Sequence, residues 1–408
     1  NYRDYSGYWA YSNVGLIGKN APYTGTFDGN GAEITADCIL FAETDGAVIK
    51  NVNINSHVYN EKSAGIVQVA NNTSIDNCDV YISLNYGICG GIAAEAYNST
   101  ITNCCVTATG YIYEFGGIVY STSGNTVIAN CVLKNSGVNV TSLYGGIVGE
   151  ACGKTEIYNC ANSDIFNSRR SGGIVSYAEM SGLTLENNMY YEENDCYDVY
   201  YDIEKDECIS KMVDKDSTVS EQDADGLYIP AKLNEYVRAN PNQVKGTTLK
   251  TWGIDYNNEP SFANNKNPEL YLIKQSGVKA DTLINGDYAR GALPGNKVTV
   301  CGIADSAVVA VTDVNGNDIK LTKSEDGYEF TMPKCDVTVS AVLDTGINET
   351  TVIDGKTYVV VKNASDFVKA VKSIADGNSE LNVYIAENIK LTAEELAEYP
   401  IYTDEMKQ

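Results

Sequence analysis

A short sequence phrase recurs at a nearly constant interval in the first half of this chain. A small residue is followed by Gly, Ile and then Val or Ala, and this phrase occurs five times, 26 to 29 residues apart. The five copies are Ala64–Val67, Gly90–Ala93, Gly116–Val119, Gly145–Val148 and Gly172–Val175. Such a period is typical of a solenoid, in which each repeat forms one coil and stacks on the next.

A second repeated phrase, in most copies Ile-x-Asn-Cys, accompanies the Gly phrases. It places one Asn in each coil: Asn51, Asn77, Asn103, Asn130, Asn159 and Asn187. Two residues earlier stands an aliphatic residue: Ile49, Ile75, Ile101, Ile128, Ile157 or Leu185. Asn tolerates left-handed backbone, and stacked amides can hydrogen-bond from coil to coil. We therefore predict an Asn ladder at a bend and an aliphatic column in the core.

The residue types between these phrases favour strands. Short runs of Val, Ile, Thr and Tyr are broken by Gly and Asn, whereas the Leu spacing or helical period of leucine-rich and ankyrin repeats is missing. We predict a mainly β protein with a right-handed parallel β-helix, a small antiparallel β domain and a short C-terminal α/β segment. The Gly pairs are interpreted as tight corners or as places where neighbouring coils approach closely.

Four of the 12 cysteines share one position of the repeat. They are Cys78, Cys104, Cys131 and Cys160. Side chains of one column point in parallel, whereas a disulfide needs Cβ atoms that face each other, so we expect buried, reduced thiols. The sequence leaves the state of Cys196 and Cys208 open. Cys301 and Cys335 fall in one later domain and could pair there.

The segment Gly15–Ile34, GLIGKNAPYTGTFDGNGAEI, precedes the repeats. Together with them it resembles the opening of the GLUG-motif solenoids of bacterial surface proteins, which have a pectin-lyase-like β-helix. The resemblance covers roughly residues 1–200. It implies a secreted or cell-wall-attached, adhesin-like bacterial protein, and it transfers no enzymatic activity.

The rest of the chain divides into segments with other patterns. The predicted segments are 1–205 (β-helix with its N-terminal opening), 206–275 (solenoid end and cap), 276–345 (small antiparallel β domain) and 346–408 (α/β segment). In the cap we expect a helix at 230–239 and a closing strand within 249–262, since an open last coil exposes core and strand edges. The third segment resembles the internalin-type B-repeat and related bacterial repeat domains. The fourth resembles the lead-in to a second solenoid, which implies a longer multidomain protein.

The charge of the chain excludes several partners. The 408 residues carry a net charge of −25 and give a pI near 4.3, which argues against nucleic acid and anionic membranes. No run approaches the length of a membrane span, so we expect no membrane insertion. We also expect no cofactor and no metal. His57 is the only histidine, and Thr312–Lys320 fits a hairpin turn better than a calcium loop.

Two glutamates share one position of the repeat. Glu95 and Glu150 both stand four residues after the second Gly of their phrase, two coils apart, which is roughly 10 Å at the strand spacing. That separation is near the range of about 6.5–9.5 Å for inverting glycoside hydrolases. However, Ser121 occupies the coil between them and no third acid joins. We predict solvated glutamates and no catalytic residue, with a polysaccharide lyase or glycoside hydrolase as the alternative.

Aromatic residues gather just before the Gly phrases. They are Tyr86, Tyr113, Phe115 and Tyr144. They could form a strip that contacts a sugar or a protein, or they could be partly buried packing at a corner. A third possibility, an ice-binding column of Thr73, Thr126 and Thr155, is interrupted by Ser99 and Leu183.

These observations predict a non-catalytic extracellular protein, secreted or held at a bacterial cell surface, that serves as an adhesin-like binding or display scaffold. Its expected partner is a host or microbial surface glycan or protein. The alternative function is a carbohydrate-active β-helix. Any functional residue must lie at an outward position, because folding alone accounts for the Asn, Ile and Cys columns.

Overall fold

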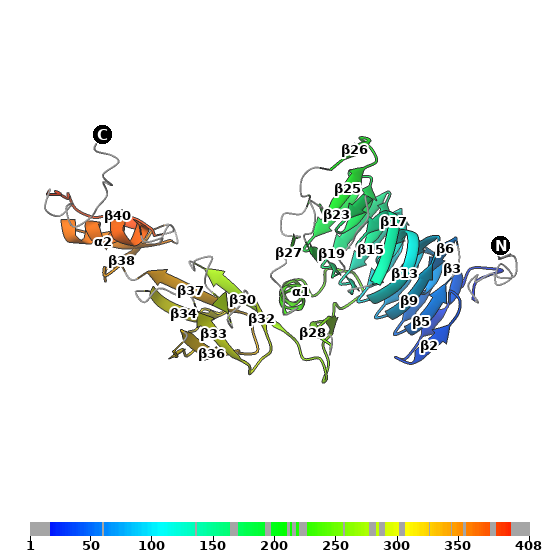
Figure 1. The fold of residues 1–408 in the computed structure, drawn as a ribbon, viewed down its shortest axis with the longest axis horizontal. Helices are drawn as coiled ribbons and strands as arrows, with labels where there is room; N and C mark the ends of the chain where they lie inside the picture. The colour runs from blue at the N-terminus through cyan, green and yellow to red at the C-terminus, as the bar shows by residue number, and fades with distance from the viewer. Residues whose placement is uncertain are drawn as a thin grey trace, which may run out of the picture. The chain divides into compact units, whose positions relative to one another are not determined.

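The chain forms two compact units, Asn1–Leu270 and Tyr271–Gln408, in the computed structural model (Figure 1). The structure describes residues 17–58, 61–134, 137–163, 170–191, 197–209, 213, 218–219, 227–255, 258–276, 283–284, 290–301, 307–325, 327–343, 345–353, 356–375 and 381–392. The first unit is the predicted parallel β-helix, and its strands stack in sequence order from blue to green in Figure 1.

Three sheets enclose the solenoid. The first sheet contains β1 (Thr26–Asp28), β4 (Val48–Lys50), β8 (Ser74–Asp76), β12 (Thr100–Thr102), β15 (Asn125–Ala129), β19 (Lys154–Tyr158) and β23 (Leu183–Glu186). The second contains β2 (Glu33–Ala36), β5 (Asn53–Val58), β9 (Asp79–Asn85), β13 (Cys105–Gly116), β16 (Val132–Leu133), β20 (Ala161–Asn162), β24 (Met189–Tyr191) and β27 (Thr218–Val219). It also includes β6 (Lys62–Ala64), β10 (Ile88–Gly90), β17 (Gly137–Gly145) and β21 (Arg170–Gly172). The third contains β3 (Phe41–Asp45), β7 (Val67–Asn71), β11 (Ala93–Tyr97), β14 (Val119–Ser123), β18 (Val148–Ala151), β22 (Val175–Ala178), β25 (Val199–Asp202) and β26 (Glu207–Cys208).

Strand alternation sorts the side chains into a core and an outer surface. In β9, Val80 and Ile82 are buried whereas Asp79 and Tyr81 are exposed, as a period of two requires. The aliphatic column is fully buried from Ile49 to Ile157. Each such side chain contributes about 1.5–3 kcal/mol on burial. The four cysteines at the shared repeat position are buried free thiols beside this column.

The once-per-coil Asn residues form a ladder at the bend between the first and second sheets. All six have left-handed backbone, with φ between 50° and 56°. Amide hydrogen bonds of 2.5 to 2.8 Å run from Asn77 to Asn51, Asn130 to Asn103, Asn159 to Asn130 and Asn187 to Asn159. The ladder is interrupted once, where Asn103 donates to Asp76 Oδ1 at 2.7 Å and the Lys250 ammonium approaches Asn77 Oδ1.

A second left-handed column, at the bend between the third and first sheets, was missed by sequence reasoning. It mixes two residue types, Gly46, Asn72, Asn98, Gly124 and Gly153, so no single letter recurs. Beside it the hydroxyls of Thr122 and Thr155 hydrogen-bond at 2.8 Å inside the solenoid. Thr73, Thr126 and Thr155 are all buried, so they form no ice-binding face.

The Gly pairs stand where backbone leaves no space for a side chain. A Cβ on Gly117 would lie 1.9 Å from the Gly146 carbonyl oxygen of the next coil, and one on Gly116 would lie 2.0 Å from the Val119 carbonyl oxygen of its own turn. The first Gly therefore permits a tight corner and the second a close approach of coils. Both predicted roles are present.

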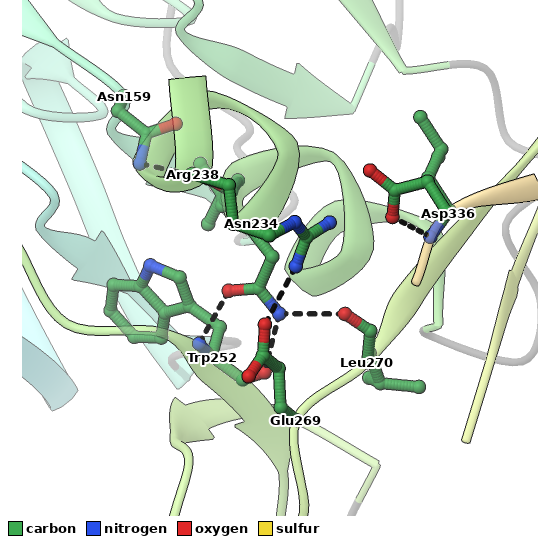
Figure 2. Close-up of polar contacts among 9 residues, drawn as sticks. Asn159, Asn234, Arg238, Trp252, Glu269, Leu270 and Asp336 are labelled. Carbon is green, nitrogen blue, oxygen red and sulfur yellow. Dashed lines mark hydrogen bonds and ion pairs between the residues drawn. The ribbon is translucent and has the colours of Figure 1, made fainter. Parts of the chain in front are cut away.

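Residues 227–270, here called the flank segment, lie along the side of the solenoid (Figure 2). The segment contains α1 (Tyr228–Ala239), β28 (Trp252–Ile254) and β29 (Pro260–Phe262). Asn234 of α1 is buried; its amide accepts from Trp252 N at 2.6 Å and donates to the Leu270 carbonyl at 2.9 Å. Arg238 pairs with Glu269 at 2.6 Å.

The predicted closing strand within 249–262 is wrong. In the described residues β28 pairs with β29 in an antiparallel hairpin outside the three solenoid sheets. Trp252 packs with α1 on the outward surface of the second sheet, over Cys105, Val132, Ala161 and Met189. This surface is apolar and stands beside ladder amides that need partners, so the flank segment removes apolar area from water and also pairs those amides.

The second unit begins with a two-sheet domain. One sheet contains β32 (Gly291–Ala292), β30 (Tyr271–Ser276), β37 (Val337–Leu343) and β34 (Ala307–Asp313); the other contains β31 (Leu283–Ile284), β33 (Lys297–Cys301), β36 (Tyr328–Thr331) and β35 (Thr322–Lys323). Both contribute to one core. The pairing is antiparallel except between β30 and β37, which are parallel. Asp313 Oδ1 accepts from Asn315 N and Asn317 N, which fixes the predicted hairpin turn. Cys301 and Cys335 are partly buried, and their pairing stays a prediction.

The C-terminal α/β segment contains β38 (Thr350–Ile353), β39 (Lys356–Val361), α2 (Ala364–Ala375) and β40 (Val383–Ile385). The Asn363 side chain accepts from Asp366 N at 2.9 Å and caps α2, whose predicted start near Ser365 is confirmed within one residue. Ala370 packs with Ile347 and Val361 in a small core.

Candidate functional site

The two glutamates predicted from the repeat lie on the outward surface of the third sheet. Glu95 of β11 and Glu150 of β18 are both in register with Ser121 of β14, which lies between them. Both side chains are partly exposed. They are therefore two coils apart, about 10 Å at the strand spacing.

Side chains from the second sheet meet these glutamates across the Gly-Gly corner. Lys62 of β6 forms an ion pair with Glu95, and the Tyr120 hydroxyl donates to Glu114 Oε2 of β13 at 2.6 Å. Side chains that point outward spread apart where two sheets meet at a convex corner. These side chains approach one another instead, so the outer surface is concave at this corner. We call this group, Lys62, Glu95, Glu114, Tyr120 and Glu150, the corner cluster.

The pKa values of Glu150, Lys62 and Tyr120 in the corner cluster are shifted from their ordinary values. Partial burial raises the pKa of Glu150, and the Glu114 charge adds to the rise, while Tyr120 and Lys62 act against it. Burial also lowers the pKa of Lys62, against the opposing effect of Glu150. The pKa of Tyr120 is raised by burial and by its hydrogen bond to Glu114. Clusters of displaced pKa values are found at functional sites, and structural ion pairs also produce them.

A glycine on the neighbouring coil makes room for Tyr120. The Tyr120 ring lies over Gly149, where a Cβ would be 2.9 Å from ring atom Cδ2. The other copies of the repeat place Gln68, Ala94 and Ser176 at this position. The Tyr-Gly combination on consecutive coils therefore builds the aromatic wall of the corner cluster.

Two tyrosines continue the Glu95 and Glu150 column toward the end of the solenoid, and a third lies beside them. Tyr177 is in register with Glu150, and Tyr201 is in register with Tyr177. The ring centroids of Tyr177 and Tyr201 are 4.9 Å apart, and Tyr200 lies 6.0 Å from Tyr177. The Tyr201 hydroxyl donates to Asp206, which raises the pKa of this tyrosine to about 12. We call Tyr177, Tyr200 and Tyr201 the tyrosine cluster.

The predicted aromatic strip is divided by the structure. Tyr86 and Tyr113 are exposed, at 66% and 52%, whereas Phe115 and Tyr144 are fully buried with ring centroids 6.2 Å apart. The prediction that Phe115 and Tyr144 contact a ligand is therefore wrong. Both share the strand position that follows the outward Glu114 column, so alternation points them inward.

Tyr111 belongs with the exposed tyrosines and was missed. It is 53% exposed, and its carbonyl accepts from Tyr86 N at 2.7 Å, while Tyr113 N donates to the Gly87 carbonyl at 2.9 Å. Tyr86 has φ of +73°, which is uncommon for a bulky side chain. The three are called the tyrosine rim, since Tyr113 directly precedes Glu114 of the corner cluster.

Sequence analysis missed Glu114, Lys62 and Tyr120 for one reason. They stand at different repeat positions from Glu95 and Glu150, so an alignment on the Gly phrase does not place them in the same column. Their encounter depends on the angle between two sheets. The tyrosine cluster could have been found, because Tyr177 occupies the aligned Glu position on the next coil.

Among the described residues there is no group of three or more His, Cys, Asp or Glu side chains that could hold a metal ion, and no described helix is long and apolar enough to cross a membrane. A scan against protein-family models and a search of curated proteins both find no match for this chain. The carboxylates and tyrosines on the outside of the β-helix are thus the basis for assigning a function.

Proposed function

We propose that this protein is an extracellular binding scaffold of a bacterial cell surface, which presents side chains of a rigid solenoid to a surface glycan or protein. The observation that carries the proposal is the tyrosine rim, Tyr86, Tyr111 and Tyr113. Tyrosine offers a large apolar ring with a polar tip, and such rings dominate contacts with sugars and proteins. The core does not need these rings, because they point to solvent.

The backbone at Tyr86 supports the same proposal. A left-handed conformation at a bulky residue costs on the order of 1–3 kcal/mol and persists where the surrounding structure enforces it. The next residue, Gly87, has φ of +93° and would take such a turn without strain. An exposed tyrosine kept at the strained position is better explained by contact with a partner than by folding.

The sequence resemblances support the surface location. The opening segment and repeats resemble GLUG-motif surface proteins, and the small β domain resembles internalin-type repeats, which serve as spacers or interaction modules. The net charge of −25 disfavours nucleic acid or an anionic membrane as the partner.

A glycan array and a pull-down of surface proteins, each with purified protein, test the proposal. Tyr86→Ala and Tyr113→Ala should each weaken at least one detected interaction about tenfold, the usual effect of removing an aromatic anchor. Tyr384→Ala, which removes another exposed tyrosine, in the second unit, is the control. The proposal is refuted if no interaction detected in either assay depends on Tyr86 or Tyr113.

A carbohydrate-active enzyme is the second candidate, favoured by the raised pKa of Glu150 beside Glu114. A protonated carboxyl can act as general acid while an ionised neighbour activates water. Release of reducing ends from a polysaccharide panel, abolished by Glu150→Gln, would establish this activity. No release from any member would count against this second candidate.

A further inference from the structure

The outward surface of the third sheet carries aromatic rings at the C-terminal end of its acidic column and beside it. The tyrosine cluster lies toward the C-terminal end of the solenoid, with centroids of Tyr177 and Tyr201 4.9 Å apart. Beside the acidic column, Tyr97 is 46% exposed and stands two residues after Glu95 on β11, so both side chains share the outward face. The face therefore carries one ring beside Glu95 and further rings beyond Glu150.

The spacing of this face suits a chain of sugars. Neighbouring coils are about 4.8 Å apart, close to the length of one pyranose residue, so an extended glycan along the solenoid axis meets one coil per sugar. Tyr97, Glu150 and Tyr177 lie on the third, fifth and sixth of the seven strands from β3 to β25. Rings can stack on apolar sugar faces while carboxylates accept hydrogen bonds from hydroxyls.

The charge of the face selects among glycans. Glu43 of β3 lies in the column of Glu95 and Glu150, so the prediction that no third acid joins them is wrong; the alignment began at the first Gly phrase, after Glu43. Glu114 faces Glu150 across the corner. The nearby ammonium group of Lys62 is paired with Glu95. A polysaccharide of uronic acids would place its carboxylates against these glutamates, and like charges in close contact disfavour binding.

We propose that the outward face of the third sheet, from Tyr97 to Tyr201, binds an extended glycan without acidic groups, with its long axis parallel to the solenoid. The inference rests on the proposed function, in which the solenoid presents side chains to a surface glycan, and it adds a ligand class and a second surface, separate from the tyrosine rim. Tyr177 and Tyr201 provide the stacking platform. Glu95 and Glu150 hold hydroxyls and exclude polyuronates.

Isothermal titration with four hexasaccharides tests the site: cellohexaose, the N-acetylated chitin hexamer, the chitosan hexamer and hexagalacturonate. A non-acidic hexamer should bind and hexagalacturonate should not. Tyr177→Ala and Tyr201→Ala should each weaken binding about tenfold, whereas Tyr177→Phe, which keeps the ring, should bind like the wild type. Tyr384→Ala, which changes an exposed tyrosine of the second unit, is the control. Glu95→Gln frees the Lys62 ammonium, so hexagalacturonate should gain measurable affinity.

Each contrary result has a defined meaning. Tighter binding of hexagalacturonate than of the non-acidic hexamers overturns the inference, as does glycan binding that survives both alanine substitutions. Failure of the four hexamers and of every non-acidic glycan on an array overturns it too. If the Tyr86 and Tyr113 substitutions still weaken binding of some ligand about tenfold, the proposed scaffold function stands without this site; if they do not, both fail.

Discussion

The side-chain amide of Asn130 uses its full hydrogen-bonding capacity. Its Nδ2 donates to Asn103 Oδ1 at 2.8 Å and to the Lys250 carbonyl at 2.9 Å. Its Oδ1 accepts from Asn159 Nδ2 and from Trp252 Nε1, both at 2.7 Å. The residue is buried and has φ of 54°. Asn130 thus forms the left-handed bend, continues the ladder and binds the flank segment.

Substitution of Asn130 should therefore be severe. Asn130→Gly keeps the left-handed backbone but leaves buried donors and acceptors unpaired, and we expect a loss of about 2–4 kcal/mol in the free energy of unfolding. Asn258→Gly is the control, because Asn258 also has positive φ but is exposed. Urea denaturation of both variants measures the difference, and equal effects would contradict the role of the ladder.

Glu150 should make stability depend on pH. Its pKa is raised in the folded state above the unfolded value of about 4.3, so the folded protein binds this proton more tightly and loses stability as the pH rises through the raised pKa. Glu150→Gln removes that penalty. The variant should melt at a higher temperature than the wild type at pH 7, with the difference vanishing near pH 4. Glu33→Gln, at an exposed glutamate, is the control, and a lower melting temperature at pH 7 would refute the prediction.

At the scale of elements, the flank segment covers one side of the solenoid. It contributes Trp252 and α1 to an apolar cluster on the second sheet, and Tyr236, Val244 and Leu249 to another on the first sheet. Thr248, Lys250 and Trp252 also hydrogen-bond to ladder amides. The segment therefore protects the bend of the central coils.

Removal of Trp252 should loosen this segment. Trp252→Ala deletes a fully buried ring that stacks on Phe262 with centroids 4.3 Å apart, and should cost about 3–5 kcal/mol. Trp252→Phe keeps most of the packing and loses the bond to Asn130, so about 1–2 kcal/mol is expected. Hydrogen exchange should accelerate in α1 in the alanine variant. Unchanged exchange there would show that the segment holds without this anchor.

At the scale of the whole molecule, the chain has separate cores in its two units. The solenoid core and the core of the two-sheet domain share no residue. Calorimetry should resolve two transitions, because units with independent cores unfold independently. Residues 271–408 expressed alone should reproduce one of them. A single transition that is absent from the fragment would show coupled folding.

The parallel β-helix, its Asn ladder and its inward Cys column follow from the sequence by itself. These features arise within one repeat, where the covalent chain and strand alternation fix which side chains face in and which residue takes the bend. The column of Glu95 and Glu150 follows for the same reason. Because the repeat period is known, residues at the same position of successive repeats can be placed in one column along the solenoid.

Only the tertiary structure decided which outward groups meet. Lys62 contacts Glu95, and Tyr120 contacts Glu114, because the second and third sheets meet at the Gly-Gly corner. The angle between the two sheets cannot be predicted from the sequence of one repeat. The flank segment joins Lys250 to Asn103, 147 residues away, because that placement covers apolar surface and unpaired amides at once. Contacts between segments far apart in the sequence depend on the total apolar surface and the polar groups that they bury. The repeat period of the sequence carries no information about that total.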